Sequence, residues 1–139
     1  MRTEKLLLDT CAFVWMSQGE PIADAANEAV DRAFVSGGAL SVSVMSAWEL
    51  GMLVSKGRLP STKSPERWFD EFIQVATLDV EDVNPRILIA ASYLPGRVHN
   101  DPTDRILIAT ARERDLTIVT RDRAILAYAD QGHVKAIAC

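Results

Sequence analysis

Short apolar runs alternate along the chain with longer segments in which apolar residues recur at helical spacing. Three runs have the length and β-branched content of buried strands: LLLDT near the start, ALSVSV at 39–44 and LTIVT at 116–120. The segments TLDVEDV and HVKAI are weaker strand candidates. Helical patterns cover 21–36, 44–56, 64–76, 85–94 and 102–114, and a shorter one follows in RAILAYAD. Strands that alternate with helices predict an α/β sandwich around a mainly parallel sheet.

The length of 139 residues is that of one ordinary domain, so we expect a single compact unit over residues 1–139. Its 48% hydrophobic and 24% charged residues are typical of a soluble globular protein. No apolar stretch is long enough to span a bilayer, and the N-terminal MRTEK leads straight into a strand-like run rather than a signal peptide. We therefore expect a cytoplasmic protein that does not bind membranes.

Charge and cysteine content narrow the functional classes. The formal net charge of −4 gives no reason to expect a basic surface, so any phosphate-bearing partner must be held locally by a metal ion or a few arginines. Cys11 and Cys139 lie near opposite ends of the chain without metal-binding spacing, which favours reduced structural thiols. His99 and His133 have no second histidine or cysteine at metal spacing, so we interpret them as surface or loop residues.

Four acidic residues interrupt apolar patterns that otherwise point into the core. They are Asp9 in KLLLD, Glu49 in VMSAWELGMLV, Asp104 in DRILIATA and Asp122, two residues after LTIVT. Taking an ionised carboxylate out of water costs several kcal/mol, so carboxylates are rarely buried without a compensating positive charge. A hard divalent cation compensates several converging carboxylates at once.

The predicted elements bring these acids toward one another. Asp9 and Asp122 follow apolar strands, and ligands of open parallel sheets collect at the carboxyl ends of the strands. Glu49 leaves a largely apolar helix face, and Asp104 lies in the first turn of a predicted helix, where the helix dipole favours a negative charge. All-oxygen ligation suits Mg²⁺ or Mn²⁺, which makes phosphodiester hydrolysis the natural reaction class.

Each acid also has a simpler interpretation, because most Asp and Glu residues are solvated or cap helices. Asp101 is better explained as the N-cap of the helix that begins at Pro102 than as a metal ligand. Asp122 could cap the next helix, and Asp9 could end its strand in a turn. Neither simple role explains Glu49, which therefore weighs most in favour of a shared site.

Several neighbouring residues have two interpretations. Thr120 is either an ordinary strand residue or a hydroxyl that bonds a metal-bound water. Three arginines beside the acids either balance charge or hold a phosphate backbone; they are Arg105, Arg121 and Arg123. Five aromatic residues at helical spacing are expected in the core or at a dimer contact rather than as base-stacking platforms; they are Trp15, Trp48, Trp68, Phe69 and Phe72.

Four segments of the chain resemble the motifs of PIN-domain nucleases, and most of all those of VapC-type ribonuclease toxins from bacterial toxin–antitoxin pairs. They are LLLDTCAF, SAWELGMLVSKGRL, HNDPTDRILIATA and LTIVTRD. The motifs run from Leu6 to Asp122, and four in the family's order are more specific than any one alone. The resemblance implies a PIN-like three-layer sandwich, with a central, mainly parallel sheet of about four or five short strands flanked by helices.

The resemblance also implies the working residues and the cofactor. By position, the acids that serve both catalysis and binding of Mg²⁺ or Mn²⁺ are Asp9, Glu49, Asp104 and Asp122. Thr120 matches a hydroxyl residue two positions before the last acid, and Asp101 is a less certain neighbour. The family further implies an RNA-cleaving homodimer and a cognate antitoxin whose tail covers the pocket. DNA is then bound only indirectly, through the antitoxin, which agrees with the acidic balance of this chain.

Two alternatives remain at the level of sequence. A receiver-like signalling domain would accept a phosphoryl group on a strand-end aspartate such as Asp9, although such domains carry an acidic pair that is missing here. A non-catalytic PIN-like binding module would keep the fold but have no turnover, and the intact acids argue against it.

Overall fold

The computed structural model describes residues 4–98 and 100–139 and contains one parallel β-sheet within them. The strands are β1 (Lys5–Leu8), β2 (Ala39–Ser43), β3 (Asp79–Glu81), β4 (Thr117–Thr120) and β5 (Lys135–Ala138). Their order in the sheet is β3-β2-β1-β4-β5, and every neighbouring pair is parallel. The predicted α/β class, the parallel sheet and all five strand segments are confirmed. His99, predicted as a surface or loop residue, lies outside the described residues.

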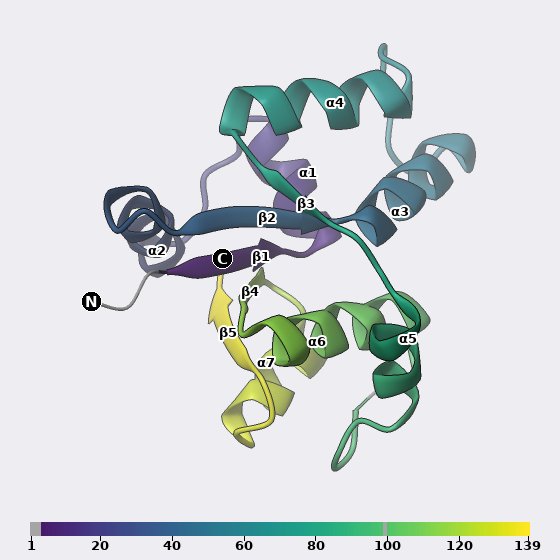
Figure 1. Ribbon diagram of the computed structural model, residues 1–139. Helices are drawn as coiled ribbons and strands as arrows, with labels where there is room; N and C mark the ends of the chain where they lie inside the picture. Colours follow the sequence, from purple (N-terminus) through teal and green to yellow (C-terminus); the bar gives the residue numbers. More distant parts are fainter. Residues whose placement is uncertain (1–3, 99) are drawn as a thin grey trace.

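Seven helices of the described residues surround this sheet. They are α1 (Thr10–Ser17), α2 (Asp24–Val35), α3 (Val44–Ser55), α4 (Pro65–Ala76), α5 (Pro85–Ser92), α6 (Pro102–Arg114) and α7 (Arg123–Asp130). In Figure 1, α1 and α4 lie above the sheet and α5, α6 and α7 lie below it, which gives three layers. None of these helices is long and apolar enough to cross a membrane.

The alternation of side chains along β1 explains why both faces of the sheet are covered. Leu6 and Leu8 pack with Phe13 and other apolar residues of one layer, whereas Leu7 packs with Leu107 and its neighbours in the opposite layer. All three leucines have no exposed surface. A strand that is apolar on both faces is typical of the centre of a parallel sheet, and β1 occupies that central position.

The sequence did not predict α1, and it placed the start of one helix too early. The segment TCAFVWMS is apolar on nearly all sides, so it shows no polar face from which a helical period can be recognised. The helix predicted from Pro21 begins only at Asp24, because Ala23 is extended and its N–H donates to the Cys139 carbonyl at the end of the sheet. The remaining predicted helices are present with small shifts at their ends.

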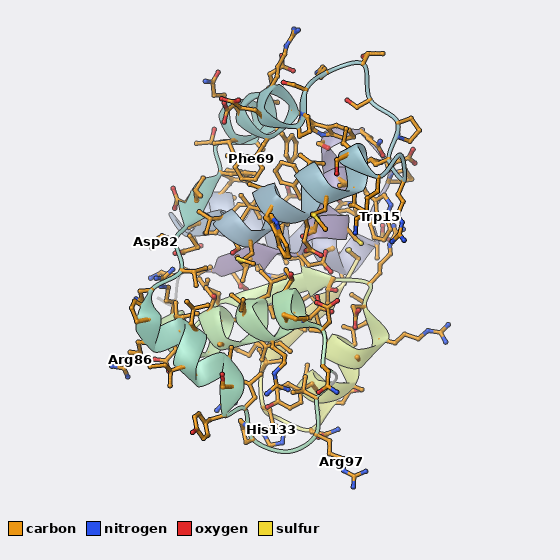
Figure 2. The ribbon with its side chains drawn as sticks, turned by 90° about the vertical axis from the view of Figure 1, so that its right-hand side faces the viewer. Trp15, Phe69, Asp82, Arg86, Arg97 and His133 are labelled. Carbon is orange, nitrogen blue, oxygen red and sulfur yellow. The ribbon has the colours of Figure 1, made fainter. Side chains whose placement is uncertain are left out.

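Parallel strands all end at the same edge of the sheet, and the arrows of β1 and β2 point toward this edge on the right in Figure 1. Helices α1, α3 and α7 follow the strands β1, β2 and β4, respectively, with at most two residues in between. Helix α6 contacts α3 near this edge as well. Residues at four helix starts from distant parts of the sequence are therefore gathered in one region, which faces the viewer in Figure 2.

Candidate functional site

Asp9 stands between β1 and α1 and is buried, with only 5% of its surface exposed. It is the N-cap of α1, because its Oδ1 accepts a hydrogen bond of 2.7 Å from the Ala12 N–H. Its other carboxylate oxygen, Oδ2, accepts a hydrogen bond from the Thr120 hydroxyl on β4. Both oxygens thus have a fixed direction, and the expected turn at Asp9 is instead a helix start.

Glu49 projects from α3 and is held by a pair of buried hydroxyl groups. The Thr10 hydroxyl donates to Glu49 Oε1, and Thr10 Oγ1 lies 2.9 Å from Ser46 Oγ. Thr10 has one proton and gives it to Glu49, so Ser46 donates to Thr10. Thr10 is 5% exposed and Ser46 is fully buried. The chain Ser46 to Thr10 to Glu49 therefore fixes the carboxylate from the protein side and leaves Oε2 for another contact.

The two remaining acids begin helices at the same edge. Asp122 is the N-cap of α7, since its Oδ1 accepts from the Ile125 N–H at 3.0 Å, and its own N–H donates to Thr120 Oγ1 at 2.9 Å. Asp104 lies in the first turn of α6. The N-cap of that helix is Asp101, whose Oδ1 accepts from the Asp104 N–H at 3.0 Å, as predicted. The capping interpretation of Asp122 is thus also correct.

The pKa values of these acids show that they lie within range of one another's charges. Burial raises the pKa of Asp9, against the Thr120 and Ala12 hydrogen bonds that lower it, and the charge of Asp122 raises it further. Burial likewise raises the pKa of Glu49, opposed by the Thr10 hydrogen bond and reinforced by the charges of Asp101 and Asp9.

The pKa of Asp104 is raised strongly. Burial raises the pKa of Asp104 from 3.8 to about 7, together with the charges of four neighbouring acids, Asp101, Asp122, Glu49 and Asp9. The thiol of Cys11 is affected by the same negative charges. Burial raises the pKa of Cys11 to about 11, together with the charges of Asp9, Glu49, Asp104 and Asp122. We refer to Asp9, Glu49, Asp104 and Asp122 as the carboxylate cluster.

Comparison with known proteins identifies the family that carries this arrangement. The family model described as the PIN domain matches residues 6–131, which include the whole carboxylate cluster. The chain belongs to the PIN domain family. This PIN domain is 28% identical to Ribonuclease VapC22 of Mycobacterium tuberculosis over 125 residues, which make up 88% of this chain and 91% of that protein.

Solved structures share the fold of this PIN domain at low sequence identity. A chain in the crystal structure of VapBC2 from Rickettsia felis bound to a promoter DNA fragment has a TM-score of 0.70 at 17% identity, with 96% of this chain and 98% of that chain covered. A chain in the DNA-bound VapBC of Salmonella typhimurium has a TM-score of 0.66 at 17% identity, with 99% of this chain and 98% of that chain covered. The PIN-like sandwich predicted from the sequence is confirmed by these likenesses.

The carboxylate cluster of this PIN domain has the donor chemistry of a divalent-metal site. Nucleases of this type generally depend on a divalent metal ion. Within residues 4–98 and 100–139, no group of three or more Asp, Glu, His or Cys side chains is arranged so that it could hold a metal ion by itself. Mg²⁺ ordinarily keeps several waters and takes only one or two carboxylates directly, so the donor chemistry of these acids fits a largely hydrated ion. The mutually repelling carboxylates, of which Asp9 is buried and the other three are half-buried, are the groups that such an ion would stabilise.

The three arginines that flank the acids have different surroundings. The Arg105 Nε donates to the Ala91 carbonyl at 2.9 Å. Arg121 lies with its guanidinium carbon 3.8 Å from the centre of the Trp15 ring, which Figure 2 labels, and donates to the Pro21 carbonyl at 3.2 Å. Arg123 is exposed at the start of α7. Arg105 and Arg121 therefore contact the protein scaffold; Arg105 is half-buried, whereas Arg121 and Arg123 are exposed.

The aromatic residues fulfil the sequence expectation with one exception. Phe69 stacks on Phe13, with ring centres 5.2 Å apart. Phe72 contacts Phe13 edge to face, also with ring centres 5.2 Å apart. Trp68 is 9% exposed within the same core cluster, and its indole N–H donates to Ser17. Trp48, in contrast, is 56% exposed on α3, so it lies outside the core, and a dimer contact is the part of the expectation that stays a prediction for it.

Thr10 and Ser46 are the site residues that the sequence interpretation missed. Thr10 directly follows Asp9, and Ser46 precedes Glu49 by three residues, which places Ser46 and Glu49 on neighbouring turns of one helix face. A hydroxyl residue beside each of two proposed ligands was a usable signal. It becomes meaningful only once α1 is known to begin at Thr10 and to face α3.

Proposed function

We propose that this PIN domain is an endoribonuclease toxin of a toxin–antitoxin pair that hydrolyses RNA phosphodiester bonds with Mg²⁺ or Mn²⁺. The observation that carries the proposal is the convergence of Asp9, Glu49, Asp104 and Asp122 at the carboxyl edge of the sheet, where burial and mutual repulsion raise the pKa of three of them. The likeness to Ribonuclease VapC22 supports RNA as the substrate.

In this proposal each residue at the edge has a defined task. The metal is held by the carboxylate cluster, and a bound ion orients a phosphate, activates a water and neutralises charge on the leaving oxygen. Thr120 fixes Asp9, while Thr10 and Ser46 fix Glu49, so that these carboxylates present constant directions to the ion. Asp101 caps α6 and adds negative charge beside Asp104. Arg123 is the arginine best placed to contact an RNA phosphate.

The proposed partner is a cognate antitoxin that covers the site and provides any contact to DNA. Structures of VapBC complexes bound to DNA, whose chains share this fold, support the proposal. An apolar hollow of about 730 Å³ between the end of α1 and α4 offers a surface for such a partner; its lining includes Met16, Trp68, Phe72 and Val75. This hollow lacks the four acids and is therefore suited to binding rather than to catalysis. The cytoplasm is the proposed location, since RNA and a newly made antitoxin are both present there.

We further propose one domain over residues 1–139 and a homodimer. All five described strands belong to one sheet, which supports the single domain. The exposed apolar residues Leu88 and Ile89 of α5, with Tyr93 directly after the helix, offer a surface that a second copy can bury.

Both alternatives predicted from the sequence are less well supported. A phospho-acceptor aspartate must be accessible, whereas Asp9 is buried and both of its oxygens accept hydrogen bonds from the protein. A non-catalytic module does not require four acids in one cluster, whose mutual repulsion opposes their ionisation.

The test is cleavage of RNA by the purified chain. Cleavage in Mg²⁺ or Mn²⁺ that stops with a chelator, returns with added metal and is lost in Asp9→Asn supports the proposal. Metal-independent cleavage that survives Asp9→Asn contradicts the mechanism. No cleavage together with no heat on Mn²⁺ titration favours the non-catalytic module. Co-purification with the product of a small adjacent gene, together with inhibition of cleavage, tests the antitoxin.

A further inference from the structure

A small groove continues from the carboxylate cluster along one side of α3. It has a volume of about 260 Å³ and runs between the second half of α3 and the start of α6. Its lining includes Glu49 and Asp101 at the end next to the site, and Lys56 and Arg58 at the far end. The groove, which we call the α3 groove, is therefore continuous with the site at which we propose that RNA is cut.

The sequence of α3 places an aromatic and a basic residue along this groove. Trp48, Met52 and Lys56 follow one another at intervals of four residues, so their side chains form one stripe on the helix surface. Trp48 is 56% exposed, and Lys56 and Arg58 are exposed as well. Lys56 lies seven positions after Glu49, about 10 Å along a helix, which is the axial length of about three stacked nucleotides.

We propose that the α3 groove binds single-stranded RNA on one side of the cleavage site, with a base stacked on Trp48 and phosphates contacted by Lys56 and Arg58. This assignment rests on the proposed ribonuclease function and adds a substrate-binding subsite to it. Exposed aromatic rings combined with basic side chains are the chemistry by which proteins bind single strands.

Charge complementarity argues for a nucleic acid rather than another occupant. The chain as a whole is acidic, with a net charge of −4, and the cluster repels phosphates unless a cation is bound. Arg105 and Arg121 contact protein carbonyls, so besides Arg123 it is the basic end of the α3 groove that supplies positive charge to a strand leaving the site. A second copy of this acidic chain gains less from two exposed basic residues, and it is an outcome that the test distinguishes.

The test measures binding of a short fluorescein-labelled single-stranded RNA by fluorescence anisotropy, with chelator present to prevent cleavage and in parallel with metal for turnover. We expect Trp48→Ala to weaken binding by about 5- to 100-fold and Trp48→Phe to retain most of the affinity. Arg58→Ala should make the dependence of log affinity on log salt shallower by about 0.7, the value for one lost phosphate contact on a single strand.

Two matched controls separate this subsite from a general surface effect. Phe34 is also 56% exposed but lies on α2, and Phe34→Ala should bind RNA like the wild type. Arg97→Ala removes the same charge as Arg58→Ala, from a loop that Figure 2 labels at the bottom of the molecule, and it should leave the salt dependence unchanged.

Three results overturn the assignment. The first is wild-type affinity and salt dependence in both Trp48→Ala and Arg58→Ala. The second is an equal effect of the controls. The third is a change in sedimentation from dimer to monomer in Trp48→Ala with RNA affinity per chain unchanged, which assigns Trp48 to contact with a second copy. A wild type that cleaves RNA while the variants bind normally rejects only the subsite, whereas a wild type that neither binds nor cleaves RNA rejects the proposed function.

Discussion

The two edges of the same parallel sheet differ in how their charged residues are neutralised. At the amino edge, opposite charges meet: Glu4 pairs with Arg32 at 3.2 Å and Lys135 pairs with Asp115 at 2.6 Å. At the carboxyl edge, Asp9 and Glu49 are held by hydroxyl and backbone donors, and the charges of neighbouring acids raise their pKa. One sheet thus has a self-neutralised edge and an edge where negative charge accumulates.

This difference separates stabilising charge from functional charge. Exposed salt bridges such as those at the amino edge contribute about 0–1 kcal/mol each and require nothing further. Buried, repelling carboxylates cost stability, so their presence indicates a ligand that compensates them. Substitutions at the two edges should therefore differ in effect. At the carboxyl edge they should lower activity without lowering stability, and at the amino edge they should change activity and stability only slightly.

The largest contrast is expected between two identical chemical changes. Glu49→Gln should lower RNA cleavage by about 100-fold or more, because loss of an outer partner of a metal ligand alone costs about 10- to 100-fold and Glu49 is a proposed ligand itself. Its melting temperature without metal should not fall, since glutamine still accepts a hydrogen bond from Thr10 and repulsion is relieved. Glu4→Gln is the matched control at the amino edge and should cleave RNA like the wild type; equal losses in both variants would remove the distinction.

A smaller effect on activity is expected from the hydroxyl chain that holds Glu49. Thr10→Val keeps the shape of the side chain but removes the hydrogen bond to Glu49, and cleavage should fall by about 10- to 100-fold. Thr10→Ser restores the hydroxyl and should recover most of the activity and the Mn²⁺ affinity. Thr110→Val, a change at another buried threonine, whose hydroxyl donates to the Ile106 carbonyl of its own helix, should leave cleavage unchanged. Full activity of Thr10→Val would show that the chain does not position Glu49.

The acid-rich edge should also show itself in the pH dependence of stability. The pKa of Asp104 is raised from 3.8 to about 7 in the folded state, so the folded protein holds a proton that the unfolded chain releases. Stability is then lost as the pH rises from about 4 to about 7, and the loss is complete above that range.

The measurement for this prediction is the free energy of unfolding in urea with chelator present, between acid and neutral pH. Asp104→Asn should become more stable relative to the wild type by about 1–2 kcal/mol across this range, a figure reduced because Asp104 is only half-buried. The shifts at Asp9 and Glu49 act in the same direction in both proteins. A difference between the two proteins that is constant with pH would mean that Asp104 titrates normally.

The smallest effect is expected at the amino edge. Lys135→Gln breaks a pair with Asp115 whose side chains are 53% and 68% exposed, so the free energy of unfolding should change by less than about 0.5 kcal/mol. RNA cleavage should be unaffected. A loss of more than about 2 kcal/mol would mean that the amino edge also depends on specific charge placement.

Local patterns in the sequence were sufficient for most of the fold and for the position of the acids. Apolar runs located all five strands, and Asp101 and Pro102 correctly marked the start of α6. Strand-end and first-turn positions then bring Asp9, Asp104 and Asp122 to one edge, because parallel strands end together. Their metal-binding role stays a prediction.

Contacts between distant segments could not be read from the sequence. Helix α1 was missed because both of its sides are apolar, and with it the hydrogen bond from Thr10 to Glu49, 39 residues away. Arg121 stacks on Trp15 and reaches the Pro21 carbonyl, 100 residues away, which no local pattern reveals. The helical spacing of Trp48 left a core position and a dimer contact open, and only the structure shows that it lies outside the core.

The central claim is that the four acids of the carboxylate cluster together form one site for divalent metal ions. Its most direct test is Mn²⁺ binding followed by electron paramagnetic resonance in the wild type, in Glu49→Gln and in Glu4→Gln at neutral pH. We predict saturable Mn²⁺ uptake by the wild type and by Glu4→Gln, and affinity at least about 10-fold weaker in Glu49→Gln. Absence of Mn²⁺ uptake by the wild type, or equal uptake by all three proteins, would contradict the account.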